Sequence, residues 1–104
     1  MDNKSKNQIF NRIENAQTIK AAGDGSLTSP RVYSIGNDII ASKTTTLLKF
    51  IPIYGYKKSY VFDAEINIDG INANTITPKE AKQIYDKMSG TWKRQQKRRG
   101  GRQK

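Results

Sequence analysis

The chain has 104 residues, 35% of them hydrophobic, and a formal net charge of +10, which is the length and apolar content of one small domain with a single core. It contains no Cys and no His. Disulfides, sulfur-ligated zinc sites and the commonest general base at neutral pH are therefore excluded. We expect no catalytic residue, no cofactor and no metal site, and a protein that is not an enzyme.

The N-terminal segment predicts a helix followed by a loop. Ser5 and Gln8 have the spacing of a capping box, and apolar residues then recur at helical spacing up to Gly23. We expect a helix over about residues 6–22, whose thin apolar stripe must pack against its own sheet or another protein. The Gly, Ser and Pro residues of 23–30 predict a loop and the main hinge of the folded part.

A β-hairpin follows this loop. Residues 31–35 and 38–43 are rich in β-branched and aromatic side chains, and Gly36-Asn37 between them suits a tight turn. Residues 44–51 extend the second strand or begin a third, and Pro52 ends regular pairing there.

The strand over residues 59–68 has the clearest pattern in the chain. Along this strand, apolar residues alternate with residues that are mostly polar, which predicts that one side of the strand is buried and the other faces solvent. The apolar set is Tyr60, Phe62, Ala64, Ile66 and Ile68. Asp69-Gly70 then predicts a two-residue turn into a short partner strand through Ile71, Ala73 and Thr75.

A second helix begins at Thr77-Pro78-Lys79-Glu80, which is a capping box with Pro at the first helical position. Its apolar stripe is formed by Ala81, Ile84, Tyr85 and Met88, and Trp92 continues it in phase. Two alternatives remain open. Either Gly90 caps this helix, or the helix continues into the basic C-terminal segment, where the internal Gly destabilises it by about 1 kcal/mol.

The predicted fold class is α+β, with a small antiparallel sheet of 3–5 strands, an N-terminal and a C-terminal helix, and a basic tail. Residues 1–90 form one domain, with the helix and loop in 1–28, the strands in 29–76 and the second helix in 77–90. Residues 91–104 form the tail. We expect its deletion to leave the core folded.

The tail carries most of the excess charge. Residues 92–104 contain seven cations and no anion, out of a net charge of +10 for the whole chain. Such an unopposed block predicts binding to a nucleic acid or an acidic protein surface, because neutralised phosphates release counterions. The expected contact residues are Lys93, Arg94, Lys97, Arg98, Arg99, Arg102 and Lys104. Residues 98–102 also resemble the arginine-glycine segments of RNA-binding proteins. The alternative is a solvated terminus that only aids solubility.

Aromatic residues give two further candidates for stacking or anchoring. Tyr54, Tyr56 and the neighbouring Lys57 and Lys58 interleave rings with cations, as in proteins that bind single strands. The alternative is that these tyrosines cover the end of a hairpin and that Tyr60 belongs to the core. Trp92 either stacks on a base, anchors in a protein pocket or packs into the core.

The acidic residues near the middle of the chain do not predict a metal site. Residues 65–70 have the acidic spacing and Gly of a calcium loop, but Ile76 stands where the closing Glu should be. Asp63, Glu65 and Asn67 therefore form the solvent side of a strand, or an acidic strip that meets a cationic partner.

The general character of residues 30–104, with the segment DAEINIDGINANTIT and a basic end, resembles small auxiliary virion proteins of tailed phages. The resemblance implies a capsid-associated protein whose folded part packs on neighbouring subunits while one terminus reaches toward the genome. Small ribosomal proteins share this layout.

We therefore expect a non-enzymatic structural or accessory component of a nucleoprotein assembly, with protein subunits and DNA, RNA or an acidic surface as partners and no small-molecule substrate. The alternative is a free regulator that binds RNA or single-stranded DNA, or a ribosome-associated protein. The sequence shows no signal peptide and no membrane span, so we expect a virion or cytoplasmic location.

Overall fold

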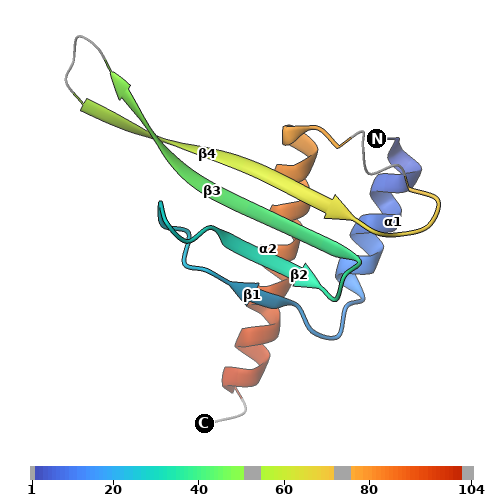
Figure 1. The fold of residues 1–104 in the computed structure, drawn as a ribbon. Helices are drawn as coiled ribbons and strands as arrows, with labels where there is room; N and C mark the ends of the chain where they lie inside the picture. Colours follow the sequence, from blue (N-terminus) through green and yellow to red (C-terminus); the bar gives the residue numbers. More distant parts are fainter. Residues whose placement is uncertain (1, 51–54, 72–75, 102–104) are drawn as a thin grey trace.

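The computed structural model describes residues 2–50, 55–71 and 76–101, with side chains for all of these except residues 48–50, 55–57 and 99–101. The chain forms an α+β plate with principal extents of 48 × 43 × 19 Å (Figure 1). Its elements are, in chain order, α1 (Asn3–Glu14), β1 (Lys20–Ala22), β2 (Arg31–Ile35), β3 (Ile39–Phe50), β4 (Gly55–Ile66) and α2 (Pro78–Gly101). The predicted fold class is confirmed.

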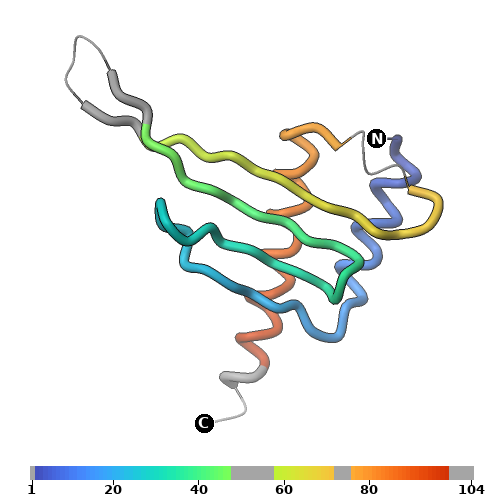
Figure 2. The backbone as a smooth tube through the Cα atoms, in the orientation of Figure 1, coloured from blue at the N-terminus to red at the C-terminus, as the bar shows by residue number. Residues whose placement is uncertain are grey.

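The sheet is an antiparallel meander with the strand order β1-β2-β3-β4. Pairing of β2 with β3 ends at Arg31 opposite Lys43, whereas β3 and β4 stay paired from Ile39–Ile66 to Phe50–Gly55. Beyond Lys43, β3 and β4 therefore continue as a two-stranded ribbon that extends past the edge of β2 (Figure 2).

Helix α1 is shorter than predicted and begins earlier. Asp2, and not Ser5, is the N-cap: its carboxylate accepts a hydrogen bond of 2.8 Å from the backbone N–H of Ser5. The helix ends at Glu14, and Asn15 closes it by donating its backbone N–H to the carbonyl of Asn11. The prediction of a helix as far as residue 22 was wrong.

Strand β1 occupies the end of the segment that was predicted as helix. It pairs with β2 through Lys20–Ser34, Ala21–Tyr33 and Ala22–Val32. Two of its three residues are Ala, which has the highest helix propensity and gives no strand signal. Tertiary pairing with β2 decides the conformation here.

The predicted central strands are confirmed as β2, β3 and β4. The turn between β2 and β3 spans residues 36–38, one residue more than predicted, and the N–H of Asp38 donates to the carbonyl of Ile35. Strand β4 ends at Ile66, so Ile68 lies beyond it. Ile71 is not in a strand, and the rest of the predicted partner strand, with Ala73 and Thr75, lies outside the described residues.

Helix α2 begins with the predicted capping box. The N–H of Glu80 donates to Thr77 Oγ1 at 3.2 Å, and the N–H of Thr77 donates to Glu80 Oε1 at 3.0 Å. The helix does not stop at Gly90 but continues to Gly101, which is the second of the two predicted alternatives. Helix α2 therefore spans the predicted boundary between domain and tail at residue 90.

Both helices cover the same face of the sheet (Figure 1), and the core lies between them and β2–β4. Its fully buried side chains are Ile9, Ile13, Ile39, Ile84 and Met88. Phe62 and Ala64 of the predicted apolar face pack against this core, and Ile66 belongs to it. Tyr60 points to the same face but is 48% exposed, so its predicted place in the core was wrong. It stands on the ribbon, beyond the part of the sheet that the core fills.

The opposite face of the sheet carries no helix, and we call it the open face. It is formed by Lys20, Ala22, Val32, Ser34, Ile40, Ser42, Thr44, Thr46, Ser59, Val61, Asp63 and Glu65, all of them partly or fully exposed. Asp63 and Glu65 therefore lie on the solvent side of β4, as predicted. Neither described helix has the length and apolar character needed to cross a bilayer.

Candidate nucleic-acid interface

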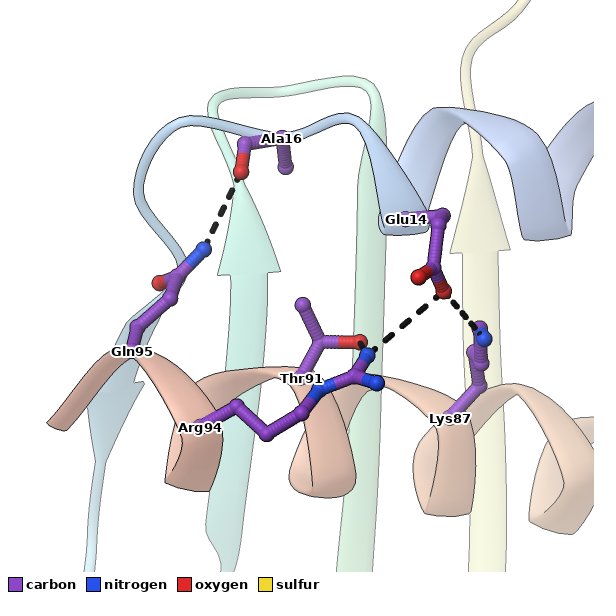
Figure 3. A network of polar contacts seen from close by, with 6 residues as sticks. All are labelled: Glu14, Ala16, Lys87, Thr91, Arg94 and Gln95. Carbon is purple, nitrogen blue, oxygen red and sulfur yellow. Dashed lines mark hydrogen bonds and ion pairs between the residues drawn. The ribbon is translucent and has the colours of Figure 1, made fainter. Parts of the chain in front are cut away.

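The C-terminal half of α2 is anchored in the fold by Thr91, Trp92 and Gln95. Thr91 and Gln95 are buried, and Trp92 packs against the core, which supports the core interpretation of this residue. The Gln95 side chain donates to the carbonyl of Ala16 at 3.0 Å (Figure 3). It also accepts from the backbone N–H of Ile19 at 3.0 Å. One amide thus holds the turn between α1 and β1 against α2, and fixes the direction in which the helix leaves the domain.

Glu14 makes a second connection between the two helices (Figure 3). Its carboxylate forms ion pairs with Lys87 and, at 3.5 Å, with Arg94. The hydrogen bond and charge of Lys87, and then the charge of Arg94, lower the pKa of Glu14 below its ordinary value of 4.5. Two cations of α2 are therefore partly neutralised by the domain itself.

The lowered pKa of Glu14 gives an acid-dependent contribution to stability. Because the folded-state pKa lies below the unfolded one, this contribution is present above about pH 4.5 and is lost as the pH falls through the folded pKa. We expect Glu14→Gln to lower the midpoint of thermal unfolding at pH 7, and the gap between the variant and the wild type to close in acid. Glu14 is exposed, so the gap is small. A gap that persists unchanged at pH 3 would show that Glu14 acts by packing.

The predicted tail cations divide between two cavities. Lys93 lines a pocket described below. Arg94, Lys97 and Arg98 line a different cavity, of about 600 Å³, next to the end of α1. All four are exposed. The side chain of Arg99, as well as Arg102 and Lys104, lies outside the described part of the chain.

A second group of cations gathers in a pocket between the sheet and α2, which we call the cationic pocket. It has a volume of about 700 Å³ and lies at the first residue of β2, where the pairing of β2 with β3 stops and the ribbon begins. Four elements contribute its cations, and three tyrosines line it with them: Arg31, Lys43, Lys58, Lys93, Tyr33, Tyr60 and Tyr85. The loop of residues 24–27 closes one side.

Arg31 is the fixed cation of this pocket. Its guanidinium donates to the carbonyl of Gly23 at 2.7 Å and to the hydroxyl of Tyr33 at 3.3 Å. The guanidinium carbon also lies 4.8 Å from the ring centre of Trp92 and 5.1 Å from that of Tyr33, in cation–π contact with both. Arg31 thus ties the loop, the sheet and the C-terminal half of α2 together.

The hydroxyl of Tyr85 remains protonated at neutral pH. Burial raises the pKa of Tyr85 to about 12, with a smaller contribution from the neighbouring Tyr33. For Tyr33, burial acts in the upward direction but is outweighed by its contacts with Ser89 and Arg31, so that its pKa is lowered from 10.0. The pocket therefore offers positive charge, and in Tyr85 a hydroxyl that can donate a hydrogen bond, to an anion.

The sequence prediction reached only part of this interface. Lys58 was predicted and lines the pocket, but Tyr54 and the side chains of Tyr56 and Lys57 lie outside the described residues. Tyr60 belonged to the predicted segment of rings and cations but was assigned to the core in the alternative, whereas Arg31 and Lys43 were not predicted as site residues. A signal does exist: a cation stands two residues before a hydroxyl-bearing side chain in Arg31/Tyr33, Lys43/Thr45 and Lys58/Tyr60. Such pairs share one face of a strand.

No cluster of acidic side chains suited to a metal ion occurs within the described ranges. The chain matches no protein-family model, no curated protein and no solved structure. The proposals below therefore rest on the geometry and charge of the chain itself.

Proposed function

We propose that the protein is a non-enzymatic structural or accessory component of a nucleoprotein assembly, with a capsid-associated virion protein as the first candidate. In this proposal the C-terminal half of α2 and the residues after it bind nucleic acid. The open face of the sheet contacts a neighbouring protein subunit. The protein would accordingly be found in the particle, or in the cytoplasm of the cell that produces it.

The observation that carries this proposal is the rigid presentation of the cationic end of α2. Arg94, Lys97 and Arg98 are exposed on a helix whose orientation is fixed by Gln95 and Trp92. A solvated tail needs no such anchoring, whereas a preorganised cationic surface loses less entropy when it binds phosphates.

The composition of the two faces supports binding of a different partner by each. The open face holds exposed apolar and small side chains, including Val61 at 54% exposure, together with the carboxylates of Asp63 and Glu65. Protein interfaces tolerate this mixture, but a polyanion is repelled by the two carboxylates. The cations described above lie on the helix side, so nucleic acid and protein subunits have separate surfaces.

The second candidate function is a free nucleic-acid-binding regulator, or a ribosome-associated protein. The cationic pocket favours it, because an exposed ring beside lysines is typical of proteins that bind single strands. Isolation of the native complex distinguishes the candidates: a particle protein co-purifies with other subunits after nuclease treatment, whereas a free regulator is released from its partners.

The test of nucleic-acid binding neutralises three cations. We expect the triple substitution Arg94→Gln, Lys97→Gln and Arg98→Gln to lower affinity for duplex DNA about 100-fold in 0.1 M salt, and to reduce the slope of log affinity against log salt by about 2 to 3. Fluorescence anisotropy over a salt series measures both quantities.

The matched control removes the same charge elsewhere. Lys4, Lys20 and Lys79 are exposed on α1, on β1 and at the start of α2. Their joint replacement by Gln is expected to leave the slope almost unchanged. Equal losses in both triple variants would show that only the net charge matters, and would contradict a defined interface on α2.

A further inference from the structure

The structure points to the cationic pocket as a binding site for a single-stranded nucleic acid, in which we infer that Tyr60 stacks on a base while the lysines around it hold the adjoining phosphates. This inference rests on the proposed function and names the form of nucleic acid that the helix side of the protein receives. It adds a site that shares only Lys93 with the expected contact residues of the tail.

The first argument is electrostatic. Arg31 and Lys43 are directly opposite each other on neighbouring strands, an arrangement in which like charges repel. The carboxylates that line the pocket have other partners: Asp86 pairs with Lys82 at 2.9 Å, and Asp24 accepts from the N–H of Ser26 at 2.9 Å. The hydrogen bonds from Ser26, and to a lesser extent the charge of Arg31, lower the pKa of Asp24, so this one carboxylate also faces Arg31. An anion between the cations would relieve the remaining repulsion between Arg31 and Lys43.

The second argument concerns the lysines. In the described part of the chain, Lys43, Lys58 and Lys93 form no ion pair, although they come from β3, β4 and α2 and line one pocket. A lysine that only aids solubility gains nothing from converging with others. A phosphodiester chain supplies negative charge at regular intervals, and separate lysines can follow it along the pocket.

The third argument is the position of Tyr60. Its ring is 48% exposed at the wall of the pocket, and Lys43 Nζ lies 4.3 Å from the ring centre. A large aromatic ring is left partly in water here, although the core lies only two residues further along β4, at Phe62. Bases stack on such rings with little regard to sequence.

The shape of the pocket selects a single strand over a duplex. A volume of about 700 Å³ lies within the range of small-ligand sites and accommodates an unstacked nucleotide. Duplex bases are stacked inside the helix and cannot reach a ring within a concavity. The hydrogen bond of 2.8 Å from Thr45 Oγ1 to the carbonyl of Gly25 fixes the loop on β3, so the pocket is formed before the ligand binds.

The experiment compares full-length variants on three fluorescent probes: a 12-nucleotide oligo(dT), oligo(U) of the same length and a blunt 12-base-pair duplex. We expect Tyr60→Ala to weaken binding of both single strands by about 5-fold to 150-fold and to leave duplex binding unchanged. Tyr60→Phe keeps the ring and should bind like the wild type. Lys43→Gln with Lys58→Gln should lower the single-strand salt slope by about 1.4.

Val61→Ala is the matched control, because Val61 is 54% exposed on the same strand but lies on the open face. It is expected to bind every probe as the wild type does. Circular dichroism of each variant checks that the fold is retained. We expect it to be, because the side chains of Tyr60 and Val61 are both exposed.

The outcomes separate this inference from the proposed function. Suppose Tyr60→Ala has the wild-type affinity for the single strands while the triple Gln variant of Arg94, Lys97 and Arg98 loses duplex affinity. The inferred single-strand site in the pocket is then contradicted, and the proposed function stands. Equal weakening on single strands and duplex by Tyr60→Ala also overturns base stacking. A wild-type protein that binds none of the probes at low salt overturns both.

Discussion

A chain that ends at Gly90 is expected to be unfolded, whereas a chain that ends at Arg98 should unfold cooperatively near the wild-type midpoint. The shorter chain loses Thr91, Trp92 and Gln95, which are buried or packed against the core. Loss of a fully buried Trp costs about 3 to 5 kcal/mol. Trp92 is only half-buried, but its loss is combined with that of the buried Thr91 and Gln95, against the about 5 to 15 kcal/mol that stabilises an ordinary domain. Deleting residues 91–104 is therefore not the harmless change that the sequence predicts.

A single substitution isolates the contribution of Gln95. Gln95→Ala leaves the carbonyl of Ala16 and the N–H of Ile19 without their partner. An unsatisfied buried group costs about 1 to 3 kcal/mol, so we expect a loss of at least about 2 kcal/mol in the free energy of unfolding. Urea denaturation measures it, and Gln96→Ala, at an exposed neighbouring position, is the control. Equal effects of both substitutions would contradict the anchoring.

Replacing Gly23 by Ala is expected to have the second largest effect. Gly23 has φ of +75°, and a Cβ atom there would lie 1.8 Å from the carbonyl oxygen of Pro30. We expect a loss of about 3 kcal/mol, because about 1 kcal/mol for the left-handed backbone adds to about 2 kcal/mol or more for the clash.

The matched control for Gly23 is Gly36→Ala. Gly36 also has a positive φ, of +51°, but a Cβ atom there would have no neighbour within 4 Å. We expect Gly36→Ala to lower the free energy of unfolding by only about 1 kcal/mol. Gly23→Ala should in addition weaken single-strand binding, because the loop of residues 24–27 lines the cationic pocket. Equal losses of stability at both positions would show that the contact with Pro30 is relieved by a shift of the loop.

The main elements could be predicted because they have local signals. The alternation along β4 and the capping box of Thr77 and Glu80 are each complete within about ten residues, and both are confirmed. The β1 strand and the end of α1 have no such signal. The conformation of β1 depends on its pairing with β2, and the turn between α1 and β1 is held by Gln95, which contacts Ile19 and Ala16, 76 and 79 residues earlier in the sequence.

The candidate site likewise has a part with a local sequence signal and a part without one. A run of cations after Trp92 is visible in any reading of the sequence, so most of the α2 surface could be predicted. The cationic pocket takes its side chains from β2, β3, β4 and α2, between Arg31 and Lys93. Only the strand register brings Arg31 opposite Lys43 and Thr45 opposite Tyr60. Register over such separations is set by the whole sheet and not by a local motif.

The plate is only 19 Å thick, yet this exceeds twice the Debye length of about 8 Å at physiological ionic strength. Asp63 and Glu65 lie on the surface opposite the cations, so a polyanion on the helix side is separated from them by the thickness of the plate. If the proposed function holds, such a plate would act as a spacer, keeping a protein subunit on its open face and a nucleic acid on its helix side about one strand-and-helix layer apart.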